Sequence, residues 1–301
     1  MGEFSFRIFW DQPTITLAFS AIFAALISLW IRPSPWIWGS LAVLSGALGY
    51  LARLLNIYSI VSLALLFILL LVLANIEMEG IKRLIVLNAV VALSFLFLLH
   101  ILPGFRSWLL FQPFGLKRGV RWYLETPFLG LFITTLYHPL LQSNKEWMRM
   151  VWQTIPMIFF QIIIIIYFAM SWGLISPNVN FSLAFFPWAL GYLFCIILPQ
   201  EALFHGVIQK ELQRLPPNRL NTILSIAIPT AAFICLQLFM QFSFLYLILL
   251  TLSGIGYSVL YHMTKSIESS VLCRFILNSI YFVFFTYLPS ICLLYTSPSP
   301  R

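Results

Sequence analysis

Charged side chains are scarce in this sequence of 301 residues. Only 9% of the residues are Asp, Glu, Lys or Arg, 61% are hydrophobic, and the mean hydropathy is +0.96. A soluble domain carries roughly 25% charged residues, and a soluble fold of this size exposes too much surface to hide so many apolar side chains. The scarcity of charge therefore excludes a soluble globular fold and favours a polytopic helical membrane protein.

Metal-binding and redox motifs are also absent. None of the four cysteines belongs to a Cys-x-x-Cys motif, and Cys195, Cys235 and Cys273 fall inside apolar stretches, as is typical of small buried hydrophobic residues. Three histidines are interpreted as residues of the membrane interface, namely His100, His138 and His262. We expect no metal site and no cofactor.

The sequence lacks the features of a nucleic-acid-binding protein and of a secretory signal peptide. The formal net charge is +8, but the basic residues are scattered singly or in pairs between apolar runs, as in loops that face anionic lipid. The N-terminal stretch "MGEFSFRIFWDQP" has neither the charged start nor the small-residue cleavage site of a signal peptide. We therefore expect membrane lipids, and not nucleic acid, as partners, and a first span that is retained.

Long apolar runs make up most of the chain. A helix needs about 20 apolar residues to cross a bilayer, and the candidate spans are 13–31, 36–52, 56–75, 84–102, 150–175, 181–199, 221–240, 243–261 and 270–289. The stretch 125–142 contains Glu125, His138 and two prolines, so it is either a tenth span or a re-entrant or interfacial segment. The sequence thus predicts an all-α, polytopic integral membrane helical bundle with nine or ten transmembrane helices.

Loop charges indicate an orientation for the second half of the chain. Loop 200–220 carries three basic residues and loop 262–269 carries Lys265, whereas the loops near 176–180 and 241–242 have no Lys or Arg. The positive-inside bias places 200–220 and 262–269 in the cytoplasm. We expect a protein of the bacterial inner membrane with its polar site near the cytoplasmic side. The four basic residues of 103–121 leave the orientation of the N-terminal half open.

The chain has no internal repeat and no low-complexity linker, yet its intramembrane polar residues gather in the second half. We expect N-terminal transmembrane helices over 1–148 and a functional helical core over 149–291. The final stretch 292–301, "CLLYTSPSPR", resembles the translated read of a transposase sequencing adapter. We interpret these ten residues as a sequencing artefact and exclude them from the fold.

Six polar side chains interrupt the apolar runs of the second half and form the candidate site. They are Gln200, Glu201, His205, Gln237, Arg274 and Asn278. An ionisable group inside a span costs a few kcal/mol, so it marks a functional site by default. Glu201 and His205 are four residues apart and share a helix face, as do Arg274 and Asn278. We expect three helices to aim these side chains into one lipid-shielded pocket.

Three short motifs in this region resemble those of the CPBP family, the CAAX-prenyl-protease-like intramembrane endopeptidases that include lysostaphin-resistance-like and Abi proteins. "QEALFHG", from Gln200, is similar to the family's Glu-Glu-x-x-x-Arg motif. "FICLQ", Phe233–Gln237, stands where the family has Phe-x-x-x-His, and "RFILN", Arg274–Asn278, stands where it has His-x-x-x-Asn. The resemblance covers roughly residues 185–285, with the motifs in the family's order and spacing.

The resemblance implies an endopeptidase that acts on membrane-associated protein or peptide substrates. In the family, the paired glutamates and the second-motif histidine activate a water, and the third-motif histidine and asparagine help to hold the oxyanion. A carboxylate pair in a medium of low dielectric constant has one raised pKa, which suits a general base. Donors aimed at a developing oxyanion are often the largest catalytic contribution. By this resemblance Glu201 activates the water.

Two of the family's water-activating positions are occupied by glutamine in this sequence. Gln200 stands at the first glutamate and Gln237 at the second-motif histidine, and neither side chain can accept a proton. Loss of a general base typically lowers a rate about 10²–10⁴-fold. Glu201 and Asn278 match the family. The substitutions leave open a weak or inactive enzyme.

The remaining departures exchange the two basic residue types, with His205 in place of the family's arginine and Arg274 in place of its third-motif histidine. A buried Glu201 needs a partner, because an unpaired carboxylate inside the membrane would protonate or destabilise the bundle. We predict that Glu201 and Arg274 form an ion pair across the pocket.

Three functions remain open from the sequence. The first is a membrane endopeptidase of this family, and the second is a non-catalytic relative that binds or regulates a membrane protein with the same pocket. The third is a small-solute transporter, because polar clusters inside spans also mark transport pathways. The absence of repeat symmetry and the register of the motifs argue against transport.

Overall fold

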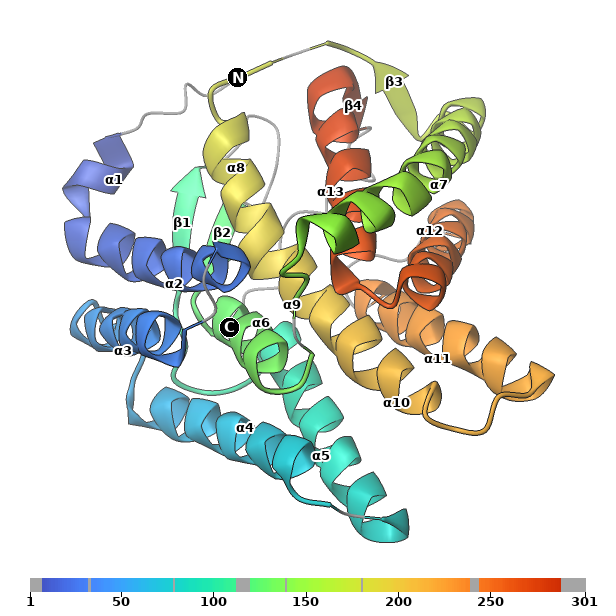
Figure 1. Ribbon diagram of the computed structural model, residues 1–301. Helices are drawn as coiled ribbons and strands as arrows, with labels where there is room; N and C mark the ends of the chain where they lie inside the picture. Colours follow the sequence, from blue (N-terminus) through green and yellow to red (C-terminus); the bar gives the residue numbers. More distant parts are fainter. Residues whose placement is uncertain are drawn as a thin grey trace.

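The computed structural model describes residues 7–31, 34–77, 79–111, 120–138, 140–179, 181–238 and 244–287. Within these ranges the chain is a bundle of helices with two small pairs of strands (Figure 1). The N-terminal elements are α1 (Arg7–Asp11), α2 (Pro13–Ile31), α3 (Pro35–Leu51), α4 (Ile57–Asn75), α5 (Gly80–Leu98), β1 (Ser107–Phe111), β2 (Val120–Tyr123) and α6 (Glu125–Leu136). The adapter-like stretch 292–301 lies outside the described residues.

The second half begins with a helix of 28 residues and continues through a second helix of 28 residues that contains two π-helical segments. Its elements are α7 (Asn144–Ser171), β3 (Ile175–Pro177), α8 (Phe185–Gly191), η1 (Tyr192–Ile197), α9 (Leu198–Glu201), η2 (Ala202–Gln209), α10 (Lys210–Leu212), α11 (Arg219–Leu238), α12 (Phe244–Thr264), α13 (Ile267–Phe284) and β4 (Phe285–Tyr287). The segments η1 and η2 are π-helical, a wider turn that often occurs at functional sites.

Eight helices of the described chain are long and apolar enough to cross a membrane. A ninth, α3, has 17 residues and lies at the lower limit of a spanning length. The predicted all-α membrane bundle is confirmed. One boundary differs, because the helix expected to end at residue 199 continues without a break from Phe185 to Leu212. The candidate polar residues Gln200, Glu201 and His205 therefore lie inside a span and not after it.

The stretch 125–142 is not a tenth span. Its helix α6 has 12 residues, about 18 Å at 1.5 Å per residue, which is too short to cross about 30 Å of hydrocarbon. Residues 125–134 are all buried. In Figure 1, α6 lies between the N-terminal helices and the helix formed by α8 to α10. Gly130 permits a close approach, since a Cβ there would lie 3.5 Å from the backbone of Pro199.

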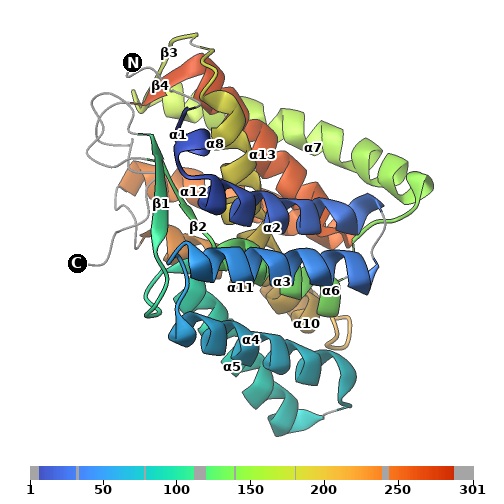
Figure 2. The same ribbon diagram turned by 90° about the vertical axis from the view of Figure 1, so that its left-hand side faces the viewer.

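The β1–β2 hairpin closes one end of the bundle (Figure 2). Trp108 and Trp122 are paired across the two strands, and their rings pack against Phe19 of α2 at centroid distances of 5.8 and 5.2 Å. Phe23, one turn further along α2, contacts Trp122 at 5.2 Å. This aromatic cluster fixes the hairpin on the helices, so that β2 can lead directly into the buried helix α6.

The opposite end of the bundle holds the loops 213–218 and 265–266. Lys265 Nζ donates to Gln213 Oε1 at 2.8 Å, which joins these two loops. Arg83, in the first turn of α5, pairs with Glu211 at 2.8 Å and anchors α5 to the same end. Since α5 is 19 residues long, its other end lies about 28 Å away, beside the hairpin. The two ends are therefore separated by about one bilayer thickness.

We predict that Gly191→Ala destabilises the protein by about 1–3 kcal/mol, because it overpacks the contact between α8 and the hairpin. A Cβ at Gly191 would lie 1.8 Å from Nε1 of the buried Trp122, whose ring is already held by the aromatic cluster. The measurement is thermal or denaturant unfolding in detergent. The control is Gly39→Ala, in α3, where a Cβ meets nothing within 4 Å. Equal stability of the two variants would contradict this packing.

Candidate functional site

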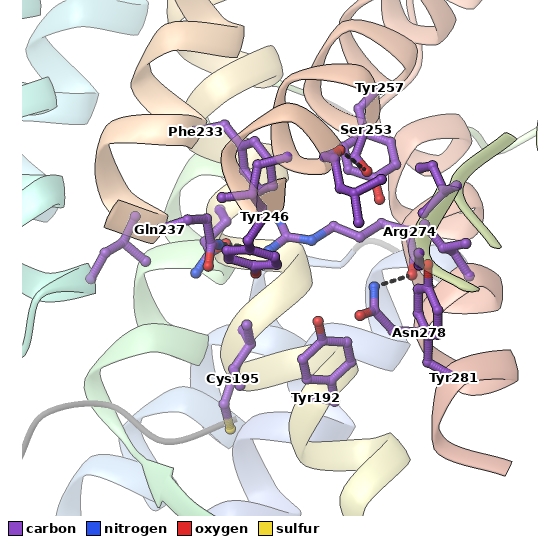
Figure 3. Close-up of a pocket in the computed structure, with 18 of the residues that line it drawn as sticks. Tyr192, Cys195, Phe233, Gln237, Tyr246, Ser253, Tyr257, Arg274, Asn278 and Tyr281 are labelled. Atoms are coloured by element: carbon purple, nitrogen blue, oxygen red, sulfur yellow. Dashed lines mark hydrogen bonds between the residues drawn. The ribbon is translucent and has the colours of Figure 1, made fainter. Parts of the chain in front are cut away.

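A cavity of about 110 Å³ lies between the second-half helices and the part of the chain around β2 (Figure 3). Four of the six candidate residues line it, namely Gln200, Gln237, Arg274 and Asn278. Figure 3 shows the Arg274 side chain reaching across the cavity toward Gln237 and Tyr246. The wall mixes apolar side chains with these polar groups, which is the usual character of a binding pocket.

Arg274 is the centre of the polar contacts. Its Nη1 lies 2.8 Å from Glu201 Oε1, and its Nη2 donates to Gln200 Oε1 at 2.6 Å. The guanidinium carbon also lies 4.9 Å from the centroid of the Phe233 ring, within range of a cation–π contact. Arg274 is 3% exposed and Glu201 is 1% exposed, so the pair is shielded from solvent. The ion pair predicted from the sequence is confirmed.

Glu201 faces a second basic group. His205 Nε2 lies 3.1 Å from Glu201 Oε2, within ion-pair distance, although Oε2 accepts no hydrogen bond of good geometry among the described residues. The other ring nitrogen of His205 contacts Gln209 Oε1, and Gln209 Nε2 donates to the backbone carbonyl of Ser258. Glu201 and His205 are thus held between helices, and neither lines the cavity.

The two remaining candidate residues lie on the wall of the cavity with weaker contacts. Gln237 Nε2 is 3.4 Å from Gln200 Oε1, at the long end of the hydrogen-bond range. Asn278 Nδ2 donates to the backbone carbonyl of Arg274, one turn earlier, at 2.7 Å. Each primary amide keeps donor capacity that a bound molecule can use.

The structure therefore brings the six candidate residues together. Contacts run from Gln237 through Gln200, Arg274 and Glu201 to His205, and Asn278 attaches to the backbone of Arg274. The contacts connect α11, α9 and α13. The three helices meet as expected, but only four of the six side chains line the cavity, and Glu201 and His205 do not. The catalytic roles assigned to these side chains remain predictions.

Residues from the N-terminal half also line the cavity, which the sequence alone does not predict. They include His100, Arg121, Tyr123 and Thr126. The sequence favours an interfacial position for His100, whereas in the structure this residue lies on the cavity wall and pairs with Glu125. A signal was available, because Glu125 in an apolar stretch needs a partner. The sequence could not identify that partner, since the two residues are 25 positions apart and on different elements.

The position of the cavity bears on the expected orientation. His100 follows the end of α5 that lies beside the hairpin, whereas loop 213–218 lies at the Arg83 end of the same helix. About one bilayer thickness therefore separates the His100 wall of the cavity from loop 213–218. From the sequence, both the polar site and loop 200–220 are expected on the cytoplasmic side. The cytoplasmic placement of the polar site remains a prediction.

Among the described residues, no three His, Cys, Asp or Glu side chains are close enough together to hold a metal ion. The polar contacts around Arg274 consist of a guanidinium, a carboxylate, an imidazole and carboxamides. Such a set suits hydrogen bonding to a peptide better than metal coordination.

A comparison with protein families identifies this part of the chain. Residues 181–280 match the family model described as type II CAAX prenyl endopeptidase, Rce1-like. The segment is an Rce1-like domain. It begins just before α8, ends within α13, and contains all six candidate residues. Comparisons with curated proteins and with solved structures give no match.

The family resemblance inferred from the three motifs is confirmed by this match. The protein is therefore a membrane protein with a CAAX-protease-like domain. His100 and Glu125 lie outside the matched residues, so one wall of the cavity is built from a part of the chain that the Rce1-like domain does not include. The division of the chain at residue 148 remains a prediction.

We predict that Glu201→Gln lowers the free energy of unfolding by about 3–5 kcal/mol, because it leaves the buried Arg274 without an anionic partner. The measurement is denaturant unfolding in detergent, with Glu79→Gln as the control. Glu79 is an exposed acid before α5 without a side-chain capping bond, so its change should stay within about 0.5 kcal/mol. A Glu201→Gln protein as stable as the parent would show that the pair contributes nothing to folding.

Proposed function

We propose that this protein is a membrane-embedded endopeptidase that hydrolyses peptide bonds in membrane-associated protein substrates, at the cavity of its Rce1-like domain. The observation that carries the proposal is the series of contacts that joins the three motifs at the wall of the cavity, from Gln237 through Gln200 to Arg274. The description of the matched family, a CAAX prenyl endopeptidase, makes a prenylated C-terminal peptide the first substrate to test.

The cavity supplies what a peptide carbonyl requires. Two helices present N–H donors to the cavity, from Arg274, Gln237 and Asn278. Glu201, which does not line the cavity, holds the guanidinium in place by its ion pair with Arg274. Preorganised donors in a site of low dielectric constant stabilise the oxyanion of a tetrahedral intermediate, and each donor contributes about 10²–10³-fold to the rate. In this arrangement Arg274 and Asn278 act at the oxyanion, and Gln237 positions the peptide.

Glu201 has a supporting role in the proposal. One of its carboxylate oxygens contacts Arg274, the other faces His205, and the side chain does not line the cavity. The expected role of Glu201 as the activator of water therefore becomes one of holding Arg274. The reaction therefore requires another residue of the cavity wall to accept the proton from water.

A second candidate function is that of a non-catalytic relative, which binds a membrane protein in the same cavity without cleaving it. It is favoured by Gln200 and Gln237, which replace a glutamate and a histidine of the family motifs. The test is a quadruple variant that restores the family residues, Gln200→Glu, His205→Arg, Gln237→His and Arg274→His. Cleavage by this variant, together with none by the parent, would support the second candidate. A transporter would instead show solute flux in liposomes that carry the parent protein.

The protein is an integral membrane protein, and we propose the bacterial inner membrane as its location. The positive-inside bias of loops 200–220 and 262–269 supports their placement in the cytoplasm. With that orientation the His100 side of the cavity faces away from the cytoplasm.

We predict that the parent protein in proteoliposomes cleaves a farnesylated reporter peptide with a CAAX-type C-terminus, and that Asn278→Ala lowers kcat by about 10²–10³-fold. The reason is the loss of one oxyanion donor. The control is Asn88→Ala, because Asn88 makes the same bond to the carbonyl one turn earlier, at 2.8 Å, on an exposed face of α5. Equal rates for Asn278→Ala and Asn88→Ala would exclude Asn278 from the reaction, and a lack of cleavage by the parent would contradict the proposed function.

A further inference from the structure

A second Glu–His pair lies at the cavity, outside the Rce1-like domain. His100 Nδ1 is 2.7 Å from Glu125 Oε1. The Glu125 side chain is 1% exposed, and its Oε2 has no hydrogen-bond partner among the described residues. The His100 ring stacks on Tyr123 with a centroid distance of 3.6 Å and an angle of 18° between the planes. The ring is thus oriented by a carboxylate on one edge and by an aromatic ring on one face.

The free nitrogen of this histidine is available to the cavity. His100 lines the cavity, its Nδ1 is engaged by Glu125, and no described group pairs with its Nε2. A carboxylate at Nδ1 fixes the tautomer that has its proton on Nδ1, so the lone pair of Nε2 can accept a proton. The pair Glu201–His205 lacks this freedom, because both ring nitrogens of His205 are engaged and neither residue lines the cavity.

The backbone at His100 supports a role for its side chain. His100 has a φ of +55° at the end of α5, where the chain leaves the helix. Glycine or asparagine is preferred at such a position, and another residue costs about 1 kcal/mol or more. Arg53 and Lys265 have a similar φ, but at His100 this conformation places the imidazole against Glu125 and at the cavity wall.

We propose that His100 is the catalytic base of this cavity and that Glu125 is its positioning residue. The inference rests on the proposed endopeptidase function, and it supplies the proton acceptor that Gln200 and Gln237 cannot provide. The base thus comes from the N-terminal half, while the oxyanion donors come from the Rce1-like domain. Both groups line the same cavity.

In the proposed hydrolysis, His100 first accepts a proton and later returns it. His100 Nε2 takes a proton from a water molecule, the water oxygen bonds to the carbonyl carbon of the peptide, and the π electrons move to the carbonyl oxygen beside Arg274. The electron pair returns, the C–N bond breaks, and His100 gives its proton to the leaving nitrogen. The products are a carboxylic acid and an amine, and His100 and Glu125 end in their starting states.

The first test uses the backbone preference at His100. In His100→Gly the imidazole is removed at a position where glycine is favoured, and we expect kcat for the farnesylated reporter to fall about 10²–10⁴-fold. Free imidazole, added to the assay, should raise the rate of His100→Gly at least about tenfold, because it can occupy the space that the side chain has left. The control is His262→Gly, since His262 lies outside the cavity and bonds to Gln213. Imidazole should not change the rate of that variant.

The second test concerns Glu125. We expect Glu125→Gln to lower kcat by about 10²-fold or more while KM for the reporter stays unchanged, because a neutral amide no longer holds the imidazole in its tautomer. A merely structural role would change KM and kcat together, or would reduce only the yield of folded protein. That result would overturn the assignment of Glu125.

The third test does not depend on activity. Diethylpyrocarbonate should label His100 of the folded parent in detergent and leave His205 unlabelled, as mass spectrometry of the four histidines would show. Labelling of His262 without labelling of His100 would overturn the proposal, because Nε2 would then be inaccessible. Cleavage that persists in His100→Gly would overturn the catalytic role of His100 alone. Absence of cleavage by the parent would overturn the proposed function and that role together.

Discussion

The buried ion pair between Arg274 and Glu201 is the constraint on which the rest of the site depends. A guanidinium inside a membrane bundle is costly unless an anion and hydrogen-bond acceptors surround it, and here Glu201 and Gln200 meet both needs from one helix at 2.8 and 2.6 Å. The pair joins α13 to α9, and the next contacts join α9 to α11 through Gln200 and Gln237. An arginine at position 274 requires the carboxylate at 201, and this carboxylate is then engaged in the ion pair.

Much of the bundle could be predicted from the sequence, because apolar runs of spanning length determine helices in a membrane. The contact between Glu201 and Arg274 could be predicted as well, since each charge needed a partner and few were available. The length of α6 could not be predicted, because an apolar stretch with Glu125 and two prolines fits a buried helix, a re-entrant segment and a span equally well. The pairing of His100 with Glu125 was missed for a related reason. His100 follows α5 and Glu125 begins α6, with the β1–β2 hairpin between them in the chain. The two residues are therefore not related by a helical spacing that the sequence would reveal.

The two Glu–His pairs of this protein lie in different environments, and we propose different roles for them. In the pair Glu201–His205, every oxygen and nitrogen faces another group of the bundle, and neither side chain lines the cavity. In the pair Glu125–His100, one nitrogen is held and the other is available to the cavity. In the proposal, the first arrangement holds Arg274 in place, and the second has the usual geometry of a base with its orienting carboxylate. The cavity would then combine a base from one half of the chain with oxyanion donors from the other.

The most direct measurement of the central claim is a double-mutant cycle on Arg274 and Glu201, with unfolding free energies in detergent for the parent, Glu201→Gln, Arg274→Met and the double variant. If the two side chains stabilise the bundle through each other, their coupling energy should reach about 1–3 kcal/mol. The double variant should also be more stable than Glu201→Gln alone, because it no longer contains an unpaired cation. Losses that simply add would contradict the account, because Arg274 would then stay in place without Glu201.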